Sequence, residues 1–439
     1  MKKHNICVIG TGYVGLVTGT CLAELGNWVV CVDSDSKKIA LLKSGKLPIY
    51  EPGLDKLVHK NTKAGRLHFS GSISEGIQFK GRPAEIIFIA VGTPPRQDGS
   101  ADLSNIESVA EQIAKNIKTY TLIVEKSTVP VETGEWISRT IERANTQKIP
   151  FDVASNPEFL REGSAVHDFL HPDRVVLGVS SKQAEAWLKD IYSPLKSPIL
   201  VTDIKSAELI KHASNSFLAA KISFINAVAN VCEKVGADVV QIARGMGMDK
   251  RIGPSFLSAG IGYGGFCFPK DLEAFYWISH KKGYDFKLLK VVKDINEEQK
   301  NWILKQVEAE LWNLEGKRIG VLGLAFKPNT DDLRFAPSLE IIQQLLERKT
   351  QVHVYDPVAM PKAKTVSGYQ GVRFCKDAYE CAREADALVL VTEWPEFAKL
   401  DFKKIRTIMH RPLLIDGRNL YDPKKLRDLG FTYKSVGRP

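Results

Sequence analysis

Short apolar runs alternate with longer stretches of mixed character through the first 200 residues. The apolar runs occupy residues 6–9, 28–32, 86–91, 121–125, 153–155 and 175–179. A short, continuous apolar run bounded by turn residues is typical of a strand buried on both faces. Because helix-like stretches separate these runs, the pattern predicts a parallel sheet covered by helices on both faces over residues 1–203.

The middle of the chain has a different pattern. Residues 205–246 are rich in Ala, Ile, Val and Phe at helical spacing, without strand-like punctuation. Gly and Pro cluster around residues 253–265, and helical spacing resumes over residues 271–312. We therefore expect a helical middle domain over residues 204–312 that contains one long connecting helix.

Alternation of strands and helices returns after Gly316. Strand-like runs occupy residues 318–323, 351–355, 387–392 and 412–415. They predict a smaller α/β domain over residues 313–439, similar in plan to the first but not a sequence repeat. The expected fold is thus α/β, with two Rossmann-like, doubly wound parallel-sheet domains joined by a helical middle domain.

Composition narrows the class of protein. The chain has 439 residues, of which 44% are hydrophobic and 26% charged, as in a multidomain globular protein. The net charge of +10 comes from Lys and Arg spread along the chain, so an anionic nucleotide is a better partner than a nucleic acid. No run approaches the roughly 18 apolar residues of a membrane span. Seven irregularly spaced cysteines predict neither a disulfide framework nor a metal site, so we expect a cytoplasmic protein without a metal.

A glycine-rich turn follows the first strand-like run. It reads Gly10-Thr11-Gly12-Tyr13-Val14-Gly15, a helix-like stretch comes next, and the second run ends at Asp33. Glycines in this turn let the backbone approach a pyrophosphate at a helix N-terminus, and the aspartate can bind a ribose 2′-hydroxyl. Since a carboxylate would repel a 2′-phosphate, the motif predicts NAD rather than NADP.

A cysteine lies in a second glycine-rich run, far along the chain. The run is Gly262-Tyr263-Gly264-Gly265-Phe266-Cys267-Phe268-Pro269-Lys270-Asp271. A thiol can trap an aldehyde as a thiohemiacetal, which loses a second hydride to become a thioester. Proximity to a lysine or a helix start favours the thiolate, so a nucleophile is a better interpretation of Cys267 than a buried structural cysteine. This pairing predicts a four-electron oxidation.

Other candidate residues follow strands or share a helix face. Gly92, Thr93 and Thr128 come after strand-like runs, where they could contact the cofactor or simply form turns. Glu158 follows another run and could be a general base, although most glutamates are merely exposed. Lys211 lies four residues before an asparagine, so the two could stabilise an oxyanion or belong to a solvated helix face.

The second α/β domain has a basic residue at its first strand end. Lys327 follows the run at residues 318–323, where a cation can bind phosphate. No full glycine triplet is present there. Half of a nucleotide-sugar site is therefore a better interpretation than a second dinucleotide site.

Together these motifs resemble the family of UDP-glucose and GDP-mannose dehydrogenases, over essentially the whole chain. The resemblance rests on residues 10–15 with Asp33, and on residues 50–54, 126–130, 156–163, 211–215, 251–271 and 326–334. It implies that Cys267 is the nucleophile. Asp271 and Lys211 would manage protons and charge at the sugar C6, and Asn215 would join Lys211 in stabilising the oxyanion. Glu158 and Thr128 would serve the hydrolytic water.

The resemblance also implies two sets of binding residues. The cofactor set is Gly10, Gly12, Tyr13, Val14, Gly15, Asp33, Lys38, Gly92, Thr93, Thr128, Glu162, Cys267, Lys270 and Arg334. The substrate set is Glu158, Phe159, Leu160, Glu162, Lys211, Asn215, Arg251, Phe256, Ser258, Ala259, Gly260, Ile261, Gly262, Tyr263, Gly264, Phe326, Lys327 and Arg418.

The implied activity is oxidation of UDP-glucose to UDP-glucuronate with two NAD per sugar, feeding polysaccharide precursor synthesis. The alternatives are GDP-mannose or a UDP-N-acetylhexosamine as substrate, or a catalytically silent NAD-binding scaffold. The resemblance implies a homodimer or a dimer-based oligomer, in which Arg251 reaches the neighbour's site, and neither a nucleic acid nor a membrane as partner.

Two residues depart from the pattern of the family. Phe266 stands where Ser commonly precedes the nucleophile, and Gly92 stands where Asn is usual. Neither change removes a catalytic group, and Phe266 either narrows the site or turns away from it.

Overall fold

The computed structural model describes residues 2–96 and 98–439, which form two compact units. The N-terminal unit comprises Met1–Ser214 and Glu273–Gly283, and the C-terminal unit comprises Asn215–Leu272 and Tyr284–Pro439. Each unit contains one sheet. The three-domain division with boundaries at residues 203 and 312 stays a prediction.

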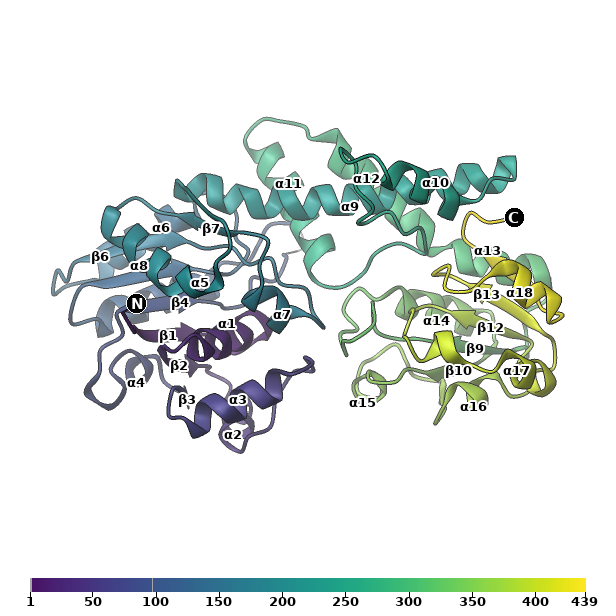
Figure 1. Ribbon diagram of the computed structural model, residues 1–439, viewed down its shortest axis with the longest axis horizontal. Coiled ribbons are helices and arrows are strands. Elements are labelled where there is room, and N and C mark those ends of the chain that lie inside the picture. Colours follow the sequence, from purple (N-terminus) through teal and green to yellow (C-terminus); the bar gives the residue numbers. More distant parts are fainter. Residues whose placement is uncertain (1, 97) are drawn as a thin grey trace. The chain divides into compact units, whose positions relative to one another are not determined.

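The sheet of the N-terminal unit has eight strands in the order β3-β2-β1-β4-β5-β6-β7-β8 (Figure 1). They are β1 (Asn5–Ile9), β2 (Trp28–Val32), β3 (Leu67–Ser70), β4 (Ile86–Ile89), β5 (Thr121–Glu125), β6 (Phe151–Ser155), β7 (Val175–Gly178) and β8 (Ile199–Thr202). The first six follow the order 3-2-1-4-5-6 of a doubly wound nucleotide-binding sheet. The expected α/β fold is confirmed here.

Helices cover both faces of this sheet. They are α1 (Tyr13–Glu24), α2 (Ser36–Lys43), α3 (Leu54–Lys63), α4 (Ile73–Ile77), α5 (Ser104–Asn116), α6 (Thr133–Ala144), α7 (Ala165–Leu170) and α8 (Lys182–Tyr192). In β1, Ile6 and Val8 pack in a core that includes residues of α1, α3 and α8, whereas Cys7 and Ile9 pack in a core with α5 and α6. Two buried faces explain why the strands are continuously apolar.

One strand pairing differs from the expected parallel sheet. β7 runs antiparallel to β6, with Ser155 opposite Gly178, while the other pairings among the described strands are parallel. The segment between β6 and β7 contains only the short helix α7, which is too short to carry the chain back along the sheet. The segment therefore leaves and returns at the carboxyl edge, where parallel sheets bind ligands.

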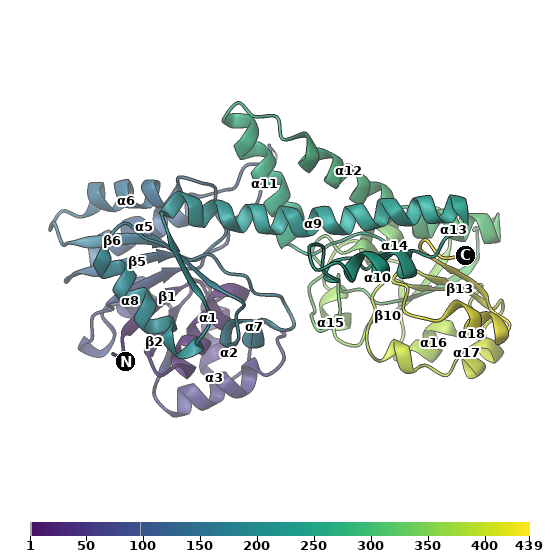
Figure 2. The same ribbon diagram turned by 45° about the horizontal axis from the view of Figure 1, so that its top comes forward.

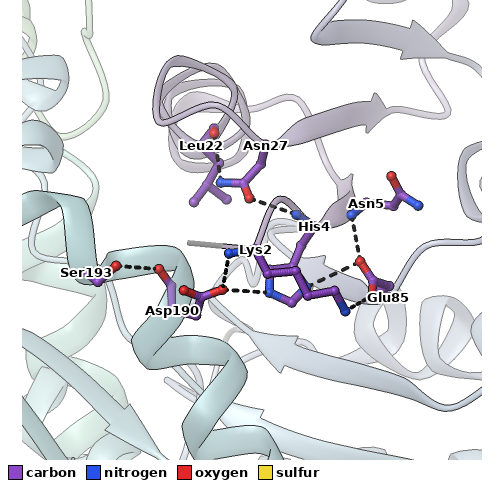
Figure 3. Close-up of polar contacts among 8 residues, drawn as sticks. All are labelled: Lys2, His4, Asn5, Leu22, Asn27, Glu85, Asp190 and Ser193. Atoms are coloured by element: carbon purple, nitrogen blue, oxygen red, sulfur yellow. Dashed lines mark hydrogen bonds and ion pairs between the residues drawn. The ribbon is translucent and has the colours of Figure 1, made fainter.

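A cluster of polar side chains lies at the amino-terminal ends of β1 and β4, on the side of the same sheet away from its carboxyl edge (Figure 3). The buried His4 ring lies between two carboxylates, with Nδ1 3.3 Å from Glu85 Oε2 and Nε2 3.3 Å from Asp190 Oδ2. Asn27 Oδ1 accepts the His4 backbone N–H at 3.2 Å. The cluster connects β1, β4 and α8 away from the edge that carries the glycine-rich turn.

The sheet of the C-terminal unit has six strands in the order β11-β10-β9-β12-β13-β14. They are β9 (Arg318–Leu322), β10 (Gln351–Tyr355), β11 (Arg373–Phe374), β12 (Ala387–Leu390), β13 (Leu413–Asp416) and β14 (Thr432–Ser435), and their pairings are parallel. This is the same 3-2-1-4-5-6 order as in the first unit, so the expected similarity of plan is confirmed. The helices around it are α14 (Pro337–Glu347), α15 (Met360–Ala363), α16 (Ala378–Ala382), α17 (Phe402–Ile408) and α18 (Pro423–Asp428).

Helices occupy most of the chain between the two sheets. Figure 2 shows α9 (Ile204–Val235) as one uninterrupted helix of 32 residues with α10 (Val239–Gly247) beside it. The helical stretch expected near residues 271–312 is instead three helices, α11 (Cys267–Lys281), α12 (Lys287–Lys300) and α13 (Trp302–Leu311). Gly283 lies between α11 and α12 and has a φ of +83°. Glycine takes this left-handed conformation without strain, so it is suited to the end of α11. No helix in the described part of the chain is long and apolar enough to cross a membrane.

Candidate active site

The glycine-rich turn lies where β1 meets α1. Gly10 has φ +103°, and a Cβ atom there would collide with the carbonyl oxygen of Ala90. A Cβ atom at Gly15 would collide with the carbonyl oxygen of Gly10. The tight turn and the close packing of α1 on the sheet therefore require glycine at both positions.

Gly12 is not required by protein packing. No described protein atom lies within 4 Å of the position that a Gly12 Cβ would take. Gly12 is also the N-cap of α1 and provides no side-chain hydrogen bond to the first N–H groups of the helix. An anionic group approaching this backbone explains the glycine and gives those N–H groups an acceptor, so the turn fits a dinucleotide pyrophosphate.

Asp33 follows β2 and faces the same turn. Its Oδ2 accepts hydrogen bonds from the backbone and hydroxyl of Thr11, both at 2.8 Å, and its Oδ1 accepts from Asp35 N at 2.9 Å. Lys38 Nζ lies 3.7 Å from Oδ2. Partial burial opposes ionisation, but these hydrogen bonds and the lysine charge outweigh it and lower the pKa of Asp33 below its usual value. The side chain is therefore an ionised acceptor, as binding of a ribose hydroxyl requires.

The loops after β4 and β5 are tied together at the carboxyl edge. Thr93 Oγ1 donates to the carbonyl oxygen of Thr128 at 2.9 Å, and Ser127 Oγ donates to the carbonyl oxygen of Val91 at 2.9 Å. Gly92 O accepts a hydrogen bond from Asn105 Nδ2 at 3.3 Å. The hydroxyl-bearing residues proposed from the sequence thus lie on neighbouring loops.

Lys211 and Glu158 form a buried ion pair. Lys211 Nζ donates to Glu158 Oε1 at 2.9 Å, and the two side chains are only 4% and 5% exposed. Glu158 Oε2 accepts the backbone N–H of Leu160 at 2.6 Å. The alternatives of a solvated helix face for Lys211 and an exposed Glu158 are therefore wrong.

The ring of Phe159 lies close to two cations. Its centroid is 3.6 Å from the guanidinium carbon of Arg174 and 5.5 Å from Lys211 Nζ. Both distances are within the range of a cation–π contact. The ring and the Glu158 carboxylate therefore both contact the ammonium group of Lys211.

A second buried lysine was not among the residues selected from the sequence. Lys126 Nζ donates to Asn156 Oδ1 at 2.9 Å, and Tyr192 donates its hydroxyl to the same oxygen. Burial lowers the pKa of Lys126 to about 7, with the nearby charge of Glu158 opposing and that of Lys211 adding to the effect. Lys126 could have been selected from the sequence by its position after β5, because Thr128 was selected from the same segment.

Glu51 is a further residue to which the sequence assigned no role. Gly163 donates its backbone N–H toward the Tyr13 hydroxyl and toward Glu51 Oε2, each at 2.7 Å. The segment that carries Glu162 is thus attached to the start of α1. Glu51 belongs to residues 50–54, one of the runs that carried the family resemblance.

Cys267 belongs to the C-terminal unit and is the first residue of α11, which begins four residues before the helical stretch expected from residue 271. Lys270 Nζ lies 2.6 Å from Asp271 Oδ1, and Asn215 Nδ2 donates to Asp271 Oδ2 at 2.6 Å. These three side chains are buried, whereas Cys267 is partly exposed. Asp271 is four residues after Cys267, so the carboxylate and the thiol share one face of α11.

The glycine-rich run before Cys267 packs against the loop after β9 and against α12. A Cβ atom at Gly265 would come within 2.7 Å of the Phe326 ring, and one at Gly264 would collide with the Phe335 carbonyl oxygen. Gly262, at φ +85°, packs against Asn296, whose Oδ1 accepts Tyr263 N at 2.8 Å. Close packing requires these glycines, so they also have a structural role that the sequence did not reveal.

Arg418 connects the same run to the strand ends of that sheet. Its Nη1 donates to Gly262 O at 3.0 Å and its Nε donates to Val391 O at 2.7 Å. Gly260 N donates to Asn226 Oδ1 at 2.9 Å, and Ile261 N donates to Gly417 O at 3.0 Å. The carboxyl edge of the second sheet therefore carries much of the proposed substrate set.

The second sheet has its own aspartate at the end of its second strand, but with a different environment. Asp356 is 1% exposed, and its two oxygens accept N–H groups from the following residues: Leu324, Ala325, Trp394, Val358 and Ala359. Five structural donors leave this carboxylate unsuited to a ribose. Together with the missing glycine triplet, this agrees with a partial nucleotide site rather than a second dinucleotide site.

Arg251 and Ser258 are exposed, whereas two other proposed residues have aromatic neighbours near the cysteine run. Arg251 is 89% exposed and pairs with Asp249, with Nη2 2.6 Å from Oδ2. Ser258 is exposed, Phe256 packs near Phe268, and Lys327 lies over the Phe326 ring at 5.4 Å. Nowhere in the described residues do three or more His, Cys, Asp or Glu side chains form a group that could hold a metal ion. That the protein needs no metal stays a prediction.

Three profiles of one family match the chain in order. The NAD binding domain of the UDP-glucose/GDP-mannose dehydrogenase family matches residues 4–196, the central domain matches residues 205–298, and the UDP binding domain matches residues 320–423.

Individual relatives match over the whole length. The UDP-glucose 6-dehydrogenase TuaD of Bacillus subtilis is 48% identical, covering 100% of this chain and 94% of its own. The solved UDP-glucose dehydrogenase of Pyrobaculum islandicum has a TM-score of 0.92 at 39% identity, covering 100% of this chain and 98% of its own. The solved UDP-D-ManNAc dehydrogenase of Pyrococcus horikoshii has a TM-score of 0.86 at 27% identity, covering 99% of both chains.

Proposed function

Because this chain belongs to the UDP-glucose/GDP-mannose dehydrogenase family and is an NAD-dependent dehydrogenase, we propose that it oxidises UDP-glucose to UDP-glucuronate through a covalent intermediate on Cys267. The observation that carries the proposal is the partly exposed thiol at the start of α11, on the same face as Asp271. An enzyme that stopped at the aldehyde would need no such nucleophile.

The residues of the glycine-rich turn, with Tyr13 and Val14, would hold the pyrophosphate of NAD, and Asp33 would bind its adenosine ribose. When bound, NAD supplies the hydride acceptor, once for each of the two oxidations. We assign supporting contacts to Lys38, Gly92, Thr93, Glu162 and Arg334. Asp33 favours NAD over NADP because its ionised carboxylate repels a 2′-phosphate.

In the first oxidation, C6 of the sugar loses a hydride and its hydroxyl loses a proton, which gives an aldehyde. Asp271 and Lys211 manage this proton. The Cys267 thiolate then adds to C6, so that a C–S bond forms and the carbonyl oxygen takes the negative charge. Lys211 and Asn215 stabilise that charge, because a cation and an amide donor strengthen as the oxyanion develops.

Loss of a second hydride from C6 converts the thiohemiacetal into a thioester. Water adds to C6 with help from Glu158 and Thr128, the C–S bond breaks, and the electron pair returns to the sulfur of Cys267. One UDP-glucose, one water and two NAD⁺ thus yield UDP-glucuronate, two NADH and three protons.

We assign the nucleotide-sugar contacts to the proposed substrate set. Supporting this assignment, residues 259–262 contact Arg418 and its neighbours at the carboxyl edge of the second sheet. The product would feed polysaccharide precursor synthesis in the cytoplasm. The alternative substrates are GDP-mannose and a UDP-N-acetylhexosamine, and the alternative of another class is a silent NAD-binding scaffold. The buried Lys211–Glu158 and Lys270–Asp271 pairs favour an enzyme over a scaffold, since buried charges are costly to maintain.

We propose that the protein acts as a homodimer or a dimer-based oligomer that uses α9. Phe217, Phe224 and Val231 are exposed and lie seven residues apart, so they form one apolar stripe along the helix. A Phe224→Glu variant should be a monomer by light scattering while the wild-type protein is at least a dimer. Trp312→Glu, at an exposed position outside α9, is the matched control. If the Phe224→Glu variant had the same oligomeric mass in solution as the wild-type protein, the assignment of α9 to the interface would be contradicted.

Product analysis tests the activity. Purified protein with UDP-glucose and NAD should release two NADH for each UDP-glucuronate, and a panel of GDP-mannose and UDP-N-acetylhexosamines should be oxidised far more slowly. Cys267→Ser should form no acid. Turnover of a Cys267→Ala variant at the wild-type rate would contradict the covalent route, and the absence of NADH with every sugar would support the scaffold.

A further inference from the structure

Phe266, the residue before the proposed nucleophile, lies against two cations. The ring centroid is 4.4 Å from the guanidinium carbon of Arg334 and 5.7 Å from Lys270 Nζ. Both distances fall within the range of about 6 Å for cation–π contacts. The ring of Phe266 is therefore directed toward Arg334 and Lys270 rather than away from them.

Each of the two cations is also paired with a carboxylate. Arg334 donates to both oxygens of Asp332, with its Nε 2.9 Å from each and its Nη2 2.6 Å from Oδ2. Lys270 Nζ lies 2.6 Å from Asp271 Oδ1. Phe266 therefore contacts the cations of two ion pairs that belong to different segments of the chain.

We propose that Phe266 is a positioning residue that holds Lys270 and Arg334 by its ring and, through Lys270, holds the Asp271–Asn215 pair in place on the Cys267 face of α11. This inference rests on the proposed function, which assigns Asp271 and Asn215 to proton transfer and oxyanion stabilisation. The chain of contacts is continuous, because the ring contacts Lys270, Lys270 pairs with Asp271, and Asp271 accepts from Asn215 at 2.6 Å.

The ring has an electrostatic role in addition to its volume. The backbone already joins the two segments, because Gly265 N donates to Arg334 O at 3.1 Å. What Phe266 adds is the negative face of its π system, which attracts both cations and restricts their side-chain rotamers. A leucine would fill similar space without this attraction.

The experiment compares ring variants at position 266. Phe266→Leu should lower kcat for UDP-glucose oxidation by about 5- to 30-fold with the KM for the sugar within about twofold, whereas Phe266→Tyr should retain most of the activity. Incorporating phenylalanine with one, two or three ring fluorines should lower kcat stepwise, since fluorine withdraws electrons from the ring face. Phe268 is the matched control, because its ring packs edge-on against Tyr263, with centroids 5.7 Å apart.

A stepwise loss at position 266 with a flat series at position 268 would support the inference. Equal losses in Phe266→Leu and Phe266→Tyr, or a flat fluorine series at position 266, would overturn it.

A wild-type protein that forms no UDP-glucuronate would overturn the proposed function instead. The contact is then tested without activity, by urea unfolding of Phe266→Leu, Arg334→Met and the double variant. Non-additive shifts of the midpoint would support the ring contact, and additive shifts would overturn it.

Discussion

The ammonium group of Lys211 lies 2.9 Å from the carboxylate of Glu158, and neither side chain is more than 5% exposed. A buried ion pair of this kind is a weak source of stability as long as both partners are present. Removal of one partner is costly, since the other charge is left buried without compensation.

Glu158→Gln should therefore affect both stability and catalysis. We expect the free energy of unfolding to fall by about 3 kcal/mol, because Lys211 loses its counter-charge. We expect kcat to fall by roughly 10²- to 10³-fold, since the amide cannot act as a base. Urea unfolding and initial-rate measurements test the two effects. Glu107→Gln, which removes the carboxylate of an exposed ion pair with Arg143, is the control, and equal losses in both variants would contradict a special role for Glu158.

The buried Lys126 should make stability depend on pH. Burial favours the neutral amine in the folded protein and lowers the pKa of Lys126 from 10.5 to about 7. Between these two pH values the unfolded chain binds the proton more tightly, so the free energy of unfolding rises with pH across this interval, and the full cost of burying the charge is present below about pH 7. The rise from pH 7 to pH 9 attributable to Lys126 should be about 2 kcal/mol.

Lys126→Met measures this contribution directly. The variant should lose the lysine's share of the rise, so the difference between wild type and variant should change with pH in urea unfolding at pH 7 and pH 9. Parallel pH profiles for the two proteins would show that Lys126 is not preferentially neutral in the folded state.

Asp33 and Asp356 offer a matched pair for testing the cofactor site. Asp33→Asn should raise the KM for NAD by about tenfold and reduce the preference for NAD over NADP, because the ionised ribose acceptor is lost. Asp356→Asn should lower stability, since five N–H groups lose a charged acceptor, while the KM for NAD changes little. The opposite assignment of effects would place the cofactor at the second sheet.

Two glycines of the first turn should respond differently to alanine. Gly15→Ala introduces a collision with the Gly10 carbonyl oxygen and should yield unstable or insoluble protein. Gly12→Ala meets no described protein atom within 4 Å, so it should fold with a midpoint of unfolding close to wild type. Its NAD affinity should nevertheless fall by about tenfold or more, as measured by calorimetry, because the methyl group obstructs the pyrophosphate. Unchanged affinity would place the pyrophosphate elsewhere.

The central strands of both sheets could be predicted because they are buried on two faces. The expected runs coincide with strands whose ends shift by no more than two residues, as in β4, which ends at Ile89 rather than residue 91. The four edge strands of the two sheets were not predicted. β3 and β14 contain polar residues, β8 is only partly buried, and β11 has two residues. Edge strands bury less surface, which explains the polar residues of β3 and β14, whereas the largely apolar β8 could have been predicted from its sequence.

Site residues could be selected by type and spacing, but their partners could not. Nothing in the sequence indicates that Lys211 pairs with Glu158, 53 residues away, or that Asn156 receives Lys126. The antiparallel β7 is a similar case, because its direction depends on the length of α7 rather than on its own residues. Pairings between distant segments follow from the fold, which places the strand ends together.

The ring of Phe159, between Arg174 and Lys211, and the ring of Phe266, between Arg334 and Lys270, are two versions of one arrangement. In each, an aromatic ring and a carboxylate contact the ammonium group of the same lysine. The side-chain position of each lysine can therefore be altered by changing its ring neighbour while the lysine itself is left intact. A substitution at either ring would alter the setting of one lysine alone, without replacing any charged group.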